Sequence, residues 1–168
     1  MPLDQIDTLA IAPEGQADAA AAEALVERTF GPGRYAKAAE RLREGNHFLP
    51  GLSFVARESG VLVGTVRMWP VRIGATPALL LGPIAVDAAA RRRGLGLALA
   101  AGACEAAAKA GHGLVVLVGD LGFFEKIGFE RLAPGRLRLP GPADPARVLV
   151  KALKPGVLEG LGGEVELP

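Results

Sequence analysis

Cysteine, aromatic side chains and long apolar runs are all scarce in this sequence. The single cysteine, Cys104, excludes an intrachain disulfide and zinc sites built from several cysteines. No apolar run reaches the roughly 18 residues of a membrane span, and the first residues, MPLDQIDTLAIAPEGQ, lack the charged start and apolar core of a signal peptide. The formal net charge of +1 lacks the basic excess of nucleic-acid-binding proteins. We therefore expect a cytoplasmic protein that binds neither nucleic acid nor membrane and holds no metal.

Hydrophobic residues make up 50% of the chain although aromatics contribute only 5%, so Ala, Val, Leu and Ile must form the core. Side chains of this kind favour closely packed layers of helix on sheet. The 168 residues fall within the usual size of one domain and suffice for a hydrophobic core. We expect a single domain over residues 1–168, with a core from about residue 6 to 153 and a C-terminal tail over 154–168.

Hydrophobic periodicity, glycines and capping residues predict a mixture of helices and strands, hence an α/β or α+β fold with a largely antiparallel sheet. Helices are expected at 18–29 with Asp18 as cap, at 35–43 ending at Gly45, at 94–110 and at 123–127. Strands are expected at 6–12, in a hairpin of 52–57 and 61–68, at 79–86, at 113–118 and finally at 147–153. A proline-rich loop, 134–145, precedes the last strand.

Gly82-Pro83 interrupts the apolar strand that ends at Val86. Proline lacks an N–H for the sheet ladder and is normally confined to edges or bulges. One interpretation is that the strand begins after Pro83 and the preceding leucines form a separate segment. The other is a β-bulge that turns backbone N–H and C=O groups out of the ladder. The sequence leaves both interpretations open.

The segment RRRGLG, Arg91 to Gly96, joins this strand to an alanine-rich helix. A helix N-terminus attracts anions and glycines admit a bulky anion to the backbone, so a phosphorylated ligand is expected there. A Walker A loop is excluded because G-x-x-x-x-G-K-[ST] does not occur. A dinucleotide fingerprint is excluded because Leu99 stands where its third small residue belongs. The alternative is a solvated basic corner with a tight turn.

Three successive motifs resemble those of the GNAT superfamily of N-acetyltransferases. Arg91-x-x-Gly94-x-Gly96 matches the pattern [RQ]-x-x-G-x-[GA] of the loop that binds the acetyl-CoA pyrophosphate, and the stretch 113–118 reads as the buried strand that follows. Residues 124–129, FEKIGF, resemble the signature Y-E-K-x-G-F. The strings VLVGD at 116–120 and PGVLEGLGGEV at 155–165 are similar to a branch of uncharacterised bacterial predicted acetyltransferases.

The resemblance implies a mixed, mostly antiparallel central sheet with splayed strands flanked by helices, and acetyl-CoA as co-substrate. A primary amine of a small molecule or peptide attacks the thioester directly in this family, and the backbone N–H of Val86 is the implied oxyanion donor. The family's bulge exposes strand backbone that pairs with pantetheine. The implied cofactor-binding residues are Ile84, Ala85, Val86, Arg91, Arg92, Arg93, Gly94, Leu95, Gly96 and Phe124.

The motifs do not identify the general base or the general acid. Many family members carry a tyrosine at the first position of Y-E-K-x-G-F, where its hydroxyl protonates the leaving sulfur, but this chain has Phe124. An alkyl thiol with a pKa of about 8.5 leaves readily as an anion, so we expect a slower reaction rather than none. Candidates for the base, each with a solvated or structural role as the alternative, are Glu27, Glu40, Asp120, His47 and His112.

Two other functions stay open: a noncatalytic acetyl-CoA-binding sensor or interaction module, and a structural domain of the same fold without cofactor. The acceptor is expected between the segments 29–52 and 134–145. A homodimer is a further expectation, through packing of the apolar tail 157–167 against a neighbour. A basic rim that suits an acidic acceptor is predicted from Arg34, Lys37, Arg41 and Arg43.

Overall fold

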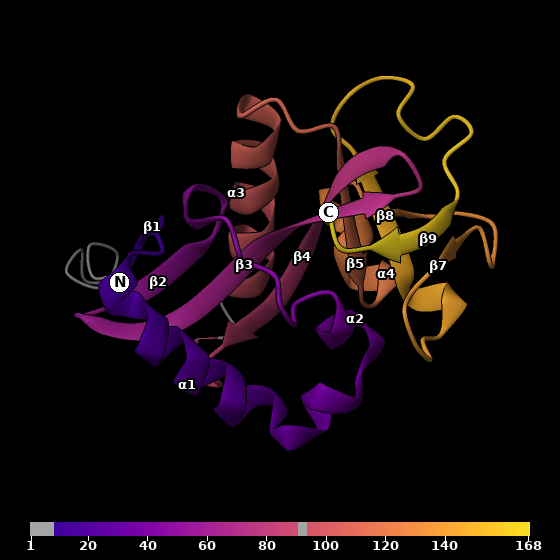
Figure 1. Cartoon of the computed structure of the whole chain (residues 1–168). Coiled ribbons are helices and arrows are strands. Elements are labelled where there is room, and N and C mark those ends of the chain that lie inside the picture. The colour runs from indigo at the N-terminus through magenta and orange to yellow at the C-terminus, as the bar shows by residue number, and fades with distance from the viewer. Residues whose placement is uncertain (1–8, 91–93) are drawn as a thin grey trace.

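The computed structural model describes residues 9–90 and 94–168, which build a mixed sheet flanked by helices (Figure 1). The main path of the sheet runs β1, β2, β3, β4, β5, β8, β6, and each neighbouring pair is antiparallel except β4 and β5. The expected mostly antiparallel sheet is confirmed. The bounds are β1 Leu9–Pro13, β2 Phe54–Glu58, β3 Val61–Ile73, β4 Thr76–Val86, β5 Leu114–Val118, β6 Glu130–Arg131, β7 Leu137–Arg138, β8 Val148–Ala152 and β9 Gly163–Glu166.

Helices α1 and α3 cover opposite faces of the sheet (Figure 1). Successive strand residues point to opposite faces, and the core follows this rule: Val55 packs with α1 and Ala56 with α3. The α-helices are α1 Ala19–Phe30, α2 Ala38–Arg41, α3 Leu95–Lys109 and α4 Leu121–Phe124. Short 3₁₀ turns span Gln16–Asp18, Pro32–Ala36, Pro50–Leu52, Glu125–Ile127 and Pro145–Arg147.

Small residues bring α3 close to the sheet. Ala100, Ala103 and Ala107 are fully buried on its inner side. On the facing strand, a Cβ added to Gly64 would lie 2.8 Å from Leu99 Cδ1, so the absence of a side chain at Gly64 leaves room for Leu99. This close packing, expected from the alanine-rich composition, holds the first turn of α3 firmly against β3 and β4.

A β-bulge in β4 resolves the two interpretations of Gly82-Pro83. The strand runs unbroken through this cis peptide, but its register with β3 shifts between Val66 and Met68, so Gly82 and Pro83 both oppose Arg67. One extra residue reverses the in-and-out alternation of a strand. Apolar residues on either side of the bulge therefore keep facing α3.

Strands β4 and β5 pair only briefly and then diverge. Leu79 and Leu80 pair with Val115 and Val116 in the parallel sense. Beyond Leu80, β4 continues along β3 while β5 continues along β8. The carboxyl ends of two central strands therefore leave an opening in the sheet, as the expected splay requires.

Two predicted helix features are wrong in detail. Asp18 precedes α1, but its carboxylate accepts from Gly15 N–H at 2.8 Å and pairs with Arg57 instead of capping that helix. The single helix expected over 35–43 is divided into a 3₁₀ turn and α2, because Lys37 between them has an extended backbone, with ψ 143°. Asp18 does occupy the N-cap position of α1, but its carboxylate caps the preceding 3₁₀ turn and binds Arg57.

The C-terminal tail is part of the sheet. β8 is not the last strand, because β9 follows and pairs with both β3 and β7. Leu161 and Val165 are buried in the chain's own core, so this part of the apolar tail packs within the molecule, and the expected homodimer stays a prediction.

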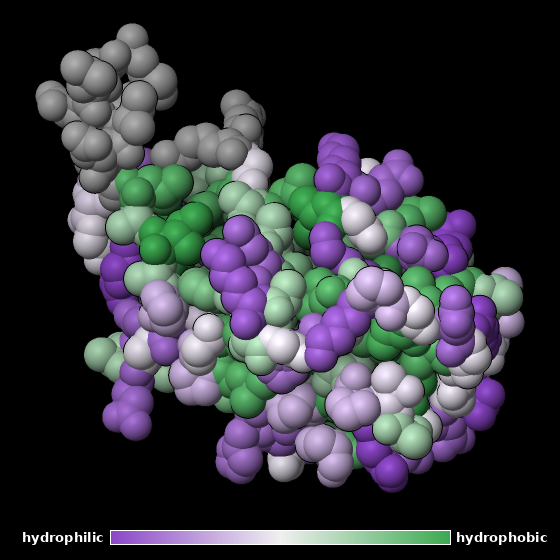
Figure 2. Space-filling model, turned by 90° about the horizontal axis from the view of Figure 1, so that it is seen from above, coloured by the Kyte–Doolittle hydropathy of each residue, from purple (hydrophilic) through white to green (hydrophobic). Residues whose placement is uncertain are grey.

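Apolar and hydrophilic residues are interspersed over the face seen in Figure 2. No helix within the described ranges is long and apolar enough to span a membrane.

Candidate active site

A cavity of about 840 Å³ opens where β4 and β5 diverge. Its walls come from the ends of both strands, the first turn of α3 and helix α4. Its rim comes from the segment after α1 and from the loop before β8, which contributes Pro142, Ala143 and Asp144. The two segments predicted to border the acceptor thus reach the same cavity, although about a hundred residues separate them.

The first turn of α3 closes one end of this cavity. Gly94 has φ 69°, a left-handed conformation suited to glycine, and a Cβ there would meet no atom within 4 Å. The Ala98 N–H donates to Gly94 C=O at 3.0 Å, so the preceding amides of the turn have no acceptor within the helix. Gly94 and Gly96 line the cavity, whereas Leu95 is buried in the core. Three predicted residues, Arg91, Arg92 and Arg93, lie outside the described residues.

Alternate residues of β4 turn their backbone toward the opening. Asp87 N–H donates to Val63 C=O at 2.8 Å, which identifies the hydrogen-bonded pairs of this antiparallel ladder. By alternation Ala85 bonds to β3, and the N–H and C=O groups of Ile84 and Val86 point away from β3. The side chain of Ala85 is buried against α1. Ile84 and Val86 therefore line the cavity and Ala85 does not.

Phe124 lines the cavity at the position where the resemblance leads one to expect tyrosine. Its ring lies directly against the Gly119 backbone, because a Cβ added there would be 2.5 Å from Phe124 Cε2. Phe123 and Phe129 hold the ring by edge contacts, with centroids 4.8 and 5.8 Å away. This part of the wall is aromatic, and Phe124 lacks the hydroxyl that a tyrosine would place there.

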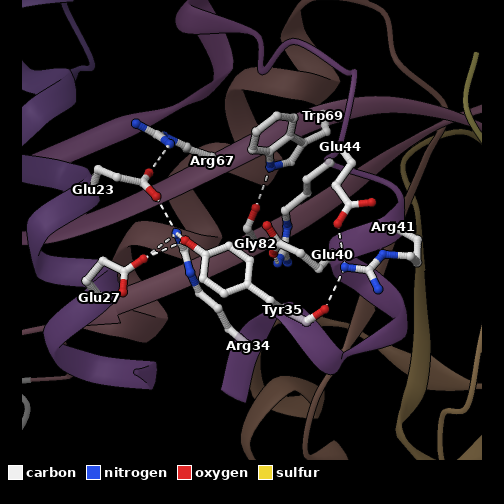
Figure 3. Close-up of polar contacts among 11 residues, drawn as sticks. Glu23, Glu27, Arg34, Tyr35, Glu40, Arg41, Glu44, Arg67, Trp69 and Gly82 are labelled. Atoms are coloured by element: carbon white, nitrogen blue, oxygen red, sulfur yellow. Dashed lines mark hydrogen bonds and ion pairs between the residues drawn. The ribbon is translucent and has the colours of Figure 1, made fainter. Parts of the chain in front are cut away.

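A network of charged side chains lies behind the opposite side of the cavity and reaches it through Arg34 (Figure 3). Arg34 donates from one amino group to Glu23, to Glu27 at 2.8 Å and to the Tyr35 hydroxyl at 2.8 Å. Tyr35 in turn donates to Glu27 at 2.7 Å. Burial by itself lowers the pKa of Arg34, but the hydrogen bonds to Glu23 and Tyr35 outweigh it and raise the pKa above its ordinary value. Arg34 thus reaches the cavity with its charge already compensated by two carboxylates.

The network continues into the core through Arg67, the residue opposite the bulge. Arg67 donates to Glu14 at 3.1 and 3.3 Å and to Glu23 at 3.0 Å, and its guanidinium lies 4.3 Å from the centroid of the Phe48 ring. The Glu14 side chain is 0% exposed. Such a buried pair adds little net stability, but losing one partner is costly. We call the whole network the charged wall: Glu14, Glu23, Glu27, Arg34, Tyr35 and Arg67.

Arg43 lies against the bulge itself. Its Nη2 is 2.9 Å from the position of a Cβ on Gly82, so the missing side chain admits the guanidinium. Its Nη1 pairs with Glu40 at 3.1 Å, and the Trp69 indole N–H donates to the Gly82 carbonyl at 2.6 Å. Burial lowers the pKa of Arg43 and the charge of Arg34 adds to this effect, while Glu40 opposes it.

The predicted bases are placed very differently. Among them, within the described ranges, Asp120 lines the cavity, exposed at the end of β5. Glu27 belongs to the charged wall and Glu40 holds Arg43. His47 is exposed after α2, and His112 lies in the turn between α3 and β5; neither lines the cavity.

The predicted basic rim is corrected in one position. Arg34, Lys37 and Arg43 line the cavity, but Arg41 pairs with Glu44 and donates to the Tyr35 carbonyl instead. Lys37 Nζ lies 5.4 Å from the centroid of the Phe30 ring.

Glu14, Arg67 and Trp69 were not predicted from the sequence. The available signal was the arginine inside the apolar strand β3, since a buried charge needs a partner. The sequence could not name that partner, because Glu14 is 53 positions away.

Three comparisons with known proteins agree with this geometry. The profile of the Acetyltransferase (GNAT) family matches residues 19–129. The Uncharacterized N-acetyltransferase YhbS of Escherichia coli strain K12 is 30% identical over 151 residues, which cover 89% of this chain and 90% of that protein. A crystal structure of E. coli YhbS in complex with CoA matches with a TM-score of 0.80 over 96% of this chain and 90% of that one, at 30% identity. A GNAT family acetyltransferase from Brucella melitensis in complex with acetyl-CoA matches with a TM-score of 0.70 at 27% identity, over 95% and 96% of the two chains.

Proposed function

Because the chain belongs to the GNAT family of acetyltransferases, we propose that it transfers the acetyl group of acetyl-CoA to a primary amine by direct attack on the thioester. The cavity between β4 and β5 carries this proposal, since it joins the first turn of α3 to the charged wall. The E. coli and B. melitensis relatives were crystallised with CoA and acetyl-CoA, which supports the choice of co-substrate.

The residues present fit this co-substrate. Gly94 and Gly96 leave the first turn of α3 open to a bulky anion, and a Cβ on Gly96 would meet the side chains of Val86 and Ile84 at 3.5 and 3.8 Å. Amides of that turn are suited to the pyrophosphate. The outward-facing backbone of Ile84 and Val86 is suited to the two amides of pantetheine, which would lie beside β4 as an added strand.

Two groups of this chain would act on the reacting atoms. The family resemblance implies that the backbone N–H of Val86, a residue that lines the cavity, would donate to the oxyanion that forms on the thioester carbon. An alkyl ammonium with a pKa of about 10.4 is only about one part in a thousand neutral at pH 7.4, so a proton must be removed first. Asp120 is the predicted carboxylate that lines the cavity, and we assign this proton to it, directly or through water.

A noncatalytic acetyl-CoA-binding module is the second candidate. Phe124 favours it, because the cavity wall there lacks the hydroxyl that many family members supply to the leaving sulfur. A thiol with a pKa of about 8.5 needs little acid catalysis near neutral pH, so this observation alone does not outweigh the first proposal.

Calorimetric titration with acetyl-CoA and CoA, followed by thiol release against a panel of amines, tests both candidates. Binding with thiol release supports the acetyltransferase, and binding without release supports the module. Absence of binding overturns both. The protein's own thiol should contribute little to the thiol signal, because burial raises the pKa of Cys104 to about 11 and the thiol then reacts slowly in the folded state.

A further inference from the structure

The charges around the cavity are unevenly distributed. Arg34, Lys37 and Arg43 line it from the segment after α1. Carboxylates of Asp120 and Asp144 line it from the side of β5 and the loop before β8. Arg147 lines the cavity on that side as well, so cations lie on both sides, whereas both lining carboxylates lie on the side of β5 and β8. This side therefore suits the ammonium group of an acceptor whose other end carries a carboxylate.

The cations on the first wall differ in how far they are compensated. A single amino group of Arg34 contacts the carboxylates of Glu23 and Glu27 and the hydroxyl of Tyr35. Lys37 is exposed to water, which weakens any ion pair it makes. Arg43 is 14% exposed and has one carboxylate partner, Glu40, at 3.1 Å. Arg34 and Arg43 both have a buried Nε without a hydrogen-bond partner, but Arg34 pairs with two carboxylates and Arg43 with one, so Arg43 is the less compensated of the two buried cations.

Arg43 lines the cavity and has donors that no described side chain uses. A guanidinium has five N–H donors, and within the described residues one contact to Glu40 is made. Its Nε is buried without a hydrogen-bond partner, and its Nη2 lies against Gly82, which itself lines the cavity. A buried, incompletely paired guanidinium favours a carboxylate, whose two oxygens match its planar fork.

We propose that the acceptor is a small amine that also carries a carboxylate, and that this carboxylate binds Arg43 while the amine lies toward Asp120. This inference rests on the proposed acetyl transfer. Gly82 precedes Val86 by four residues of β4, so the two binding points of the acceptor are separated along the strand. The acceptor therefore has several methylene groups between amine and carboxylate, as 6-aminohexanoate has and glycine has not.

The test compares kcat/KM for 6-aminohexanoate with that for 6-aminohexanamide, which differs only in the charge. We expect the carboxylate to be preferred at least about 10-fold, as for hydrogen bonds to a charged group, and Arg43→Gln to bring the ratio near one. Arg41→Gln is the matched control, because Arg41 is on the same segment, loses an arginine equally and does not line the cavity. Its ratio should equal that of the unmodified protein.

Arg43→Gln leaves Glu40 buried without its partner, so Glu40→Gln/Arg43→Gln serves where the single variant does not fold. Equal kcat/KM values for the two acceptors, or a ratio that survives in the variants, overturn the proposal. Where neither acceptor is acetylated, calorimetric binding of 6-aminohexanoate to the CoA complex decides: binding that Arg43→Gln abolishes supports it, and no binding refutes it. Failure of acetyl-CoA itself to bind refutes the proposed function instead.

Discussion

The two sides of the cavity are built in opposite ways. On the side of β4 and α3, backbone groups and glycines shape the surface, and the neighbouring side chains are apolar. On the side of α1 and α2, the charged wall and the Arg43–Glu40 pair shape it through long side chains bound to one another. The first side would hold acetyl-CoA, which is the same in every turnover. The second side would select the amine acceptor.

This difference explains which parts of a site can be recognised in a sequence. A backbone site needs a positive φ, a bulge or an absent Cβ, and therefore leaves glycine and proline at close spacing. A side-chain site needs partners that only the fold brings together. A change on one side of the cavity should leave the other side intact.

Arg67→Met should have the largest effect, on stability. The Glu14 carboxylate would remain buried without its cation, which costs about 3 to 5 kcal/mol in the free energy of unfolding. Urea denaturation measures it. The double variant Glu14→Gln/Arg67→Met should recover most of the loss. Equal stabilities for the single and the double variant would contradict the assigned pairing.

Gly96→Leu should weaken acetyl-CoA binding about 100-fold, or about 2.8 kcal/mol, while the protein stays folded. The new side chain would extend into the space bounded by Val86, Ile84 and Phe123. Gly102→Leu is the matched control, because Gly102 is in the same helix and a Cβ there meets nothing within 4 Å. If calorimetry shows that both variants bind acetyl-CoA equally weakly, the first turn of α3 is not part of the binding site.

Asp120→Asn should lower kcat about 50-fold, less than a fully sequestered base would cost, because Asp120 is exposed and water can take over part of its role. Raising the pH should restore much of the rate, since more of the amine is then neutral. A rate that does not change, or a loss that no pH recovers, would argue against proton removal by Asp120.

Phe124→Tyr should raise kcat about 3- to 10-fold, by placing a hydroxyl at the cavity wall near the leaving thiolate. The gain is small because the thiolate leaves readily without help. Steady-state kinetics at fixed acetyl-CoA measures it. An unchanged kcat would mean that thiolate departure does not limit the reaction.

Acidification should have the smallest effect and should act on the α1 side, where the pKa values of Glu23 in the charged wall and of Asp18, which Arg57 binds, are both lowered. Burial by itself raises the pKa of Glu23, but Arg34 and Arg67 outweigh it and hold the pKa below its ordinary value of 4.5. A lowered pKa contributes stability that is present above 4.5 and lost as the pH falls through the folded value. Hydrogen exchange near pH 4 and below, compared at matched intrinsic rates, should show α1 losing protection before α3. Glu23→Gln should remove that difference.

Much of the fold could be predicted from the sequence because its signals are local. The hairpin at Ser59-Gly60, the helix after Gly94 and the strand before Gly119 all have their turn residues beside them. The break at Lys37 and the pairing of β9 with β3 could not be predicted, since both depend on contacts made only in the folded chain.

The site divides in the same way. The cavity-lining residues Ile84, Val86, Gly94, Gly96 and Phe124 carry motif signals, whereas the roles of Arg43 and Arg67 depend on Glu40, Glu14 and Gly82. The backbone roles proposed for Ile84 and Val86 stay predictions until the binding experiments are done.

The charged wall has a consequence for how this protein can evolve. Arg34 and Arg67 each pair with two carboxylates, and the buried Glu14 pairs with Arg67, so replacing Arg67 alone leaves a buried charge behind. Variation there should come in coupled steps, with Glu14 and Arg67 changing together. Within the described contacts, Arg43 and Glu40 form a separate ion pair, so the two residues can be substituted together without breaking an ion pair of the charged wall. New acceptor preferences in related sequences should therefore arise first at that pair, with the wall behind it unchanged.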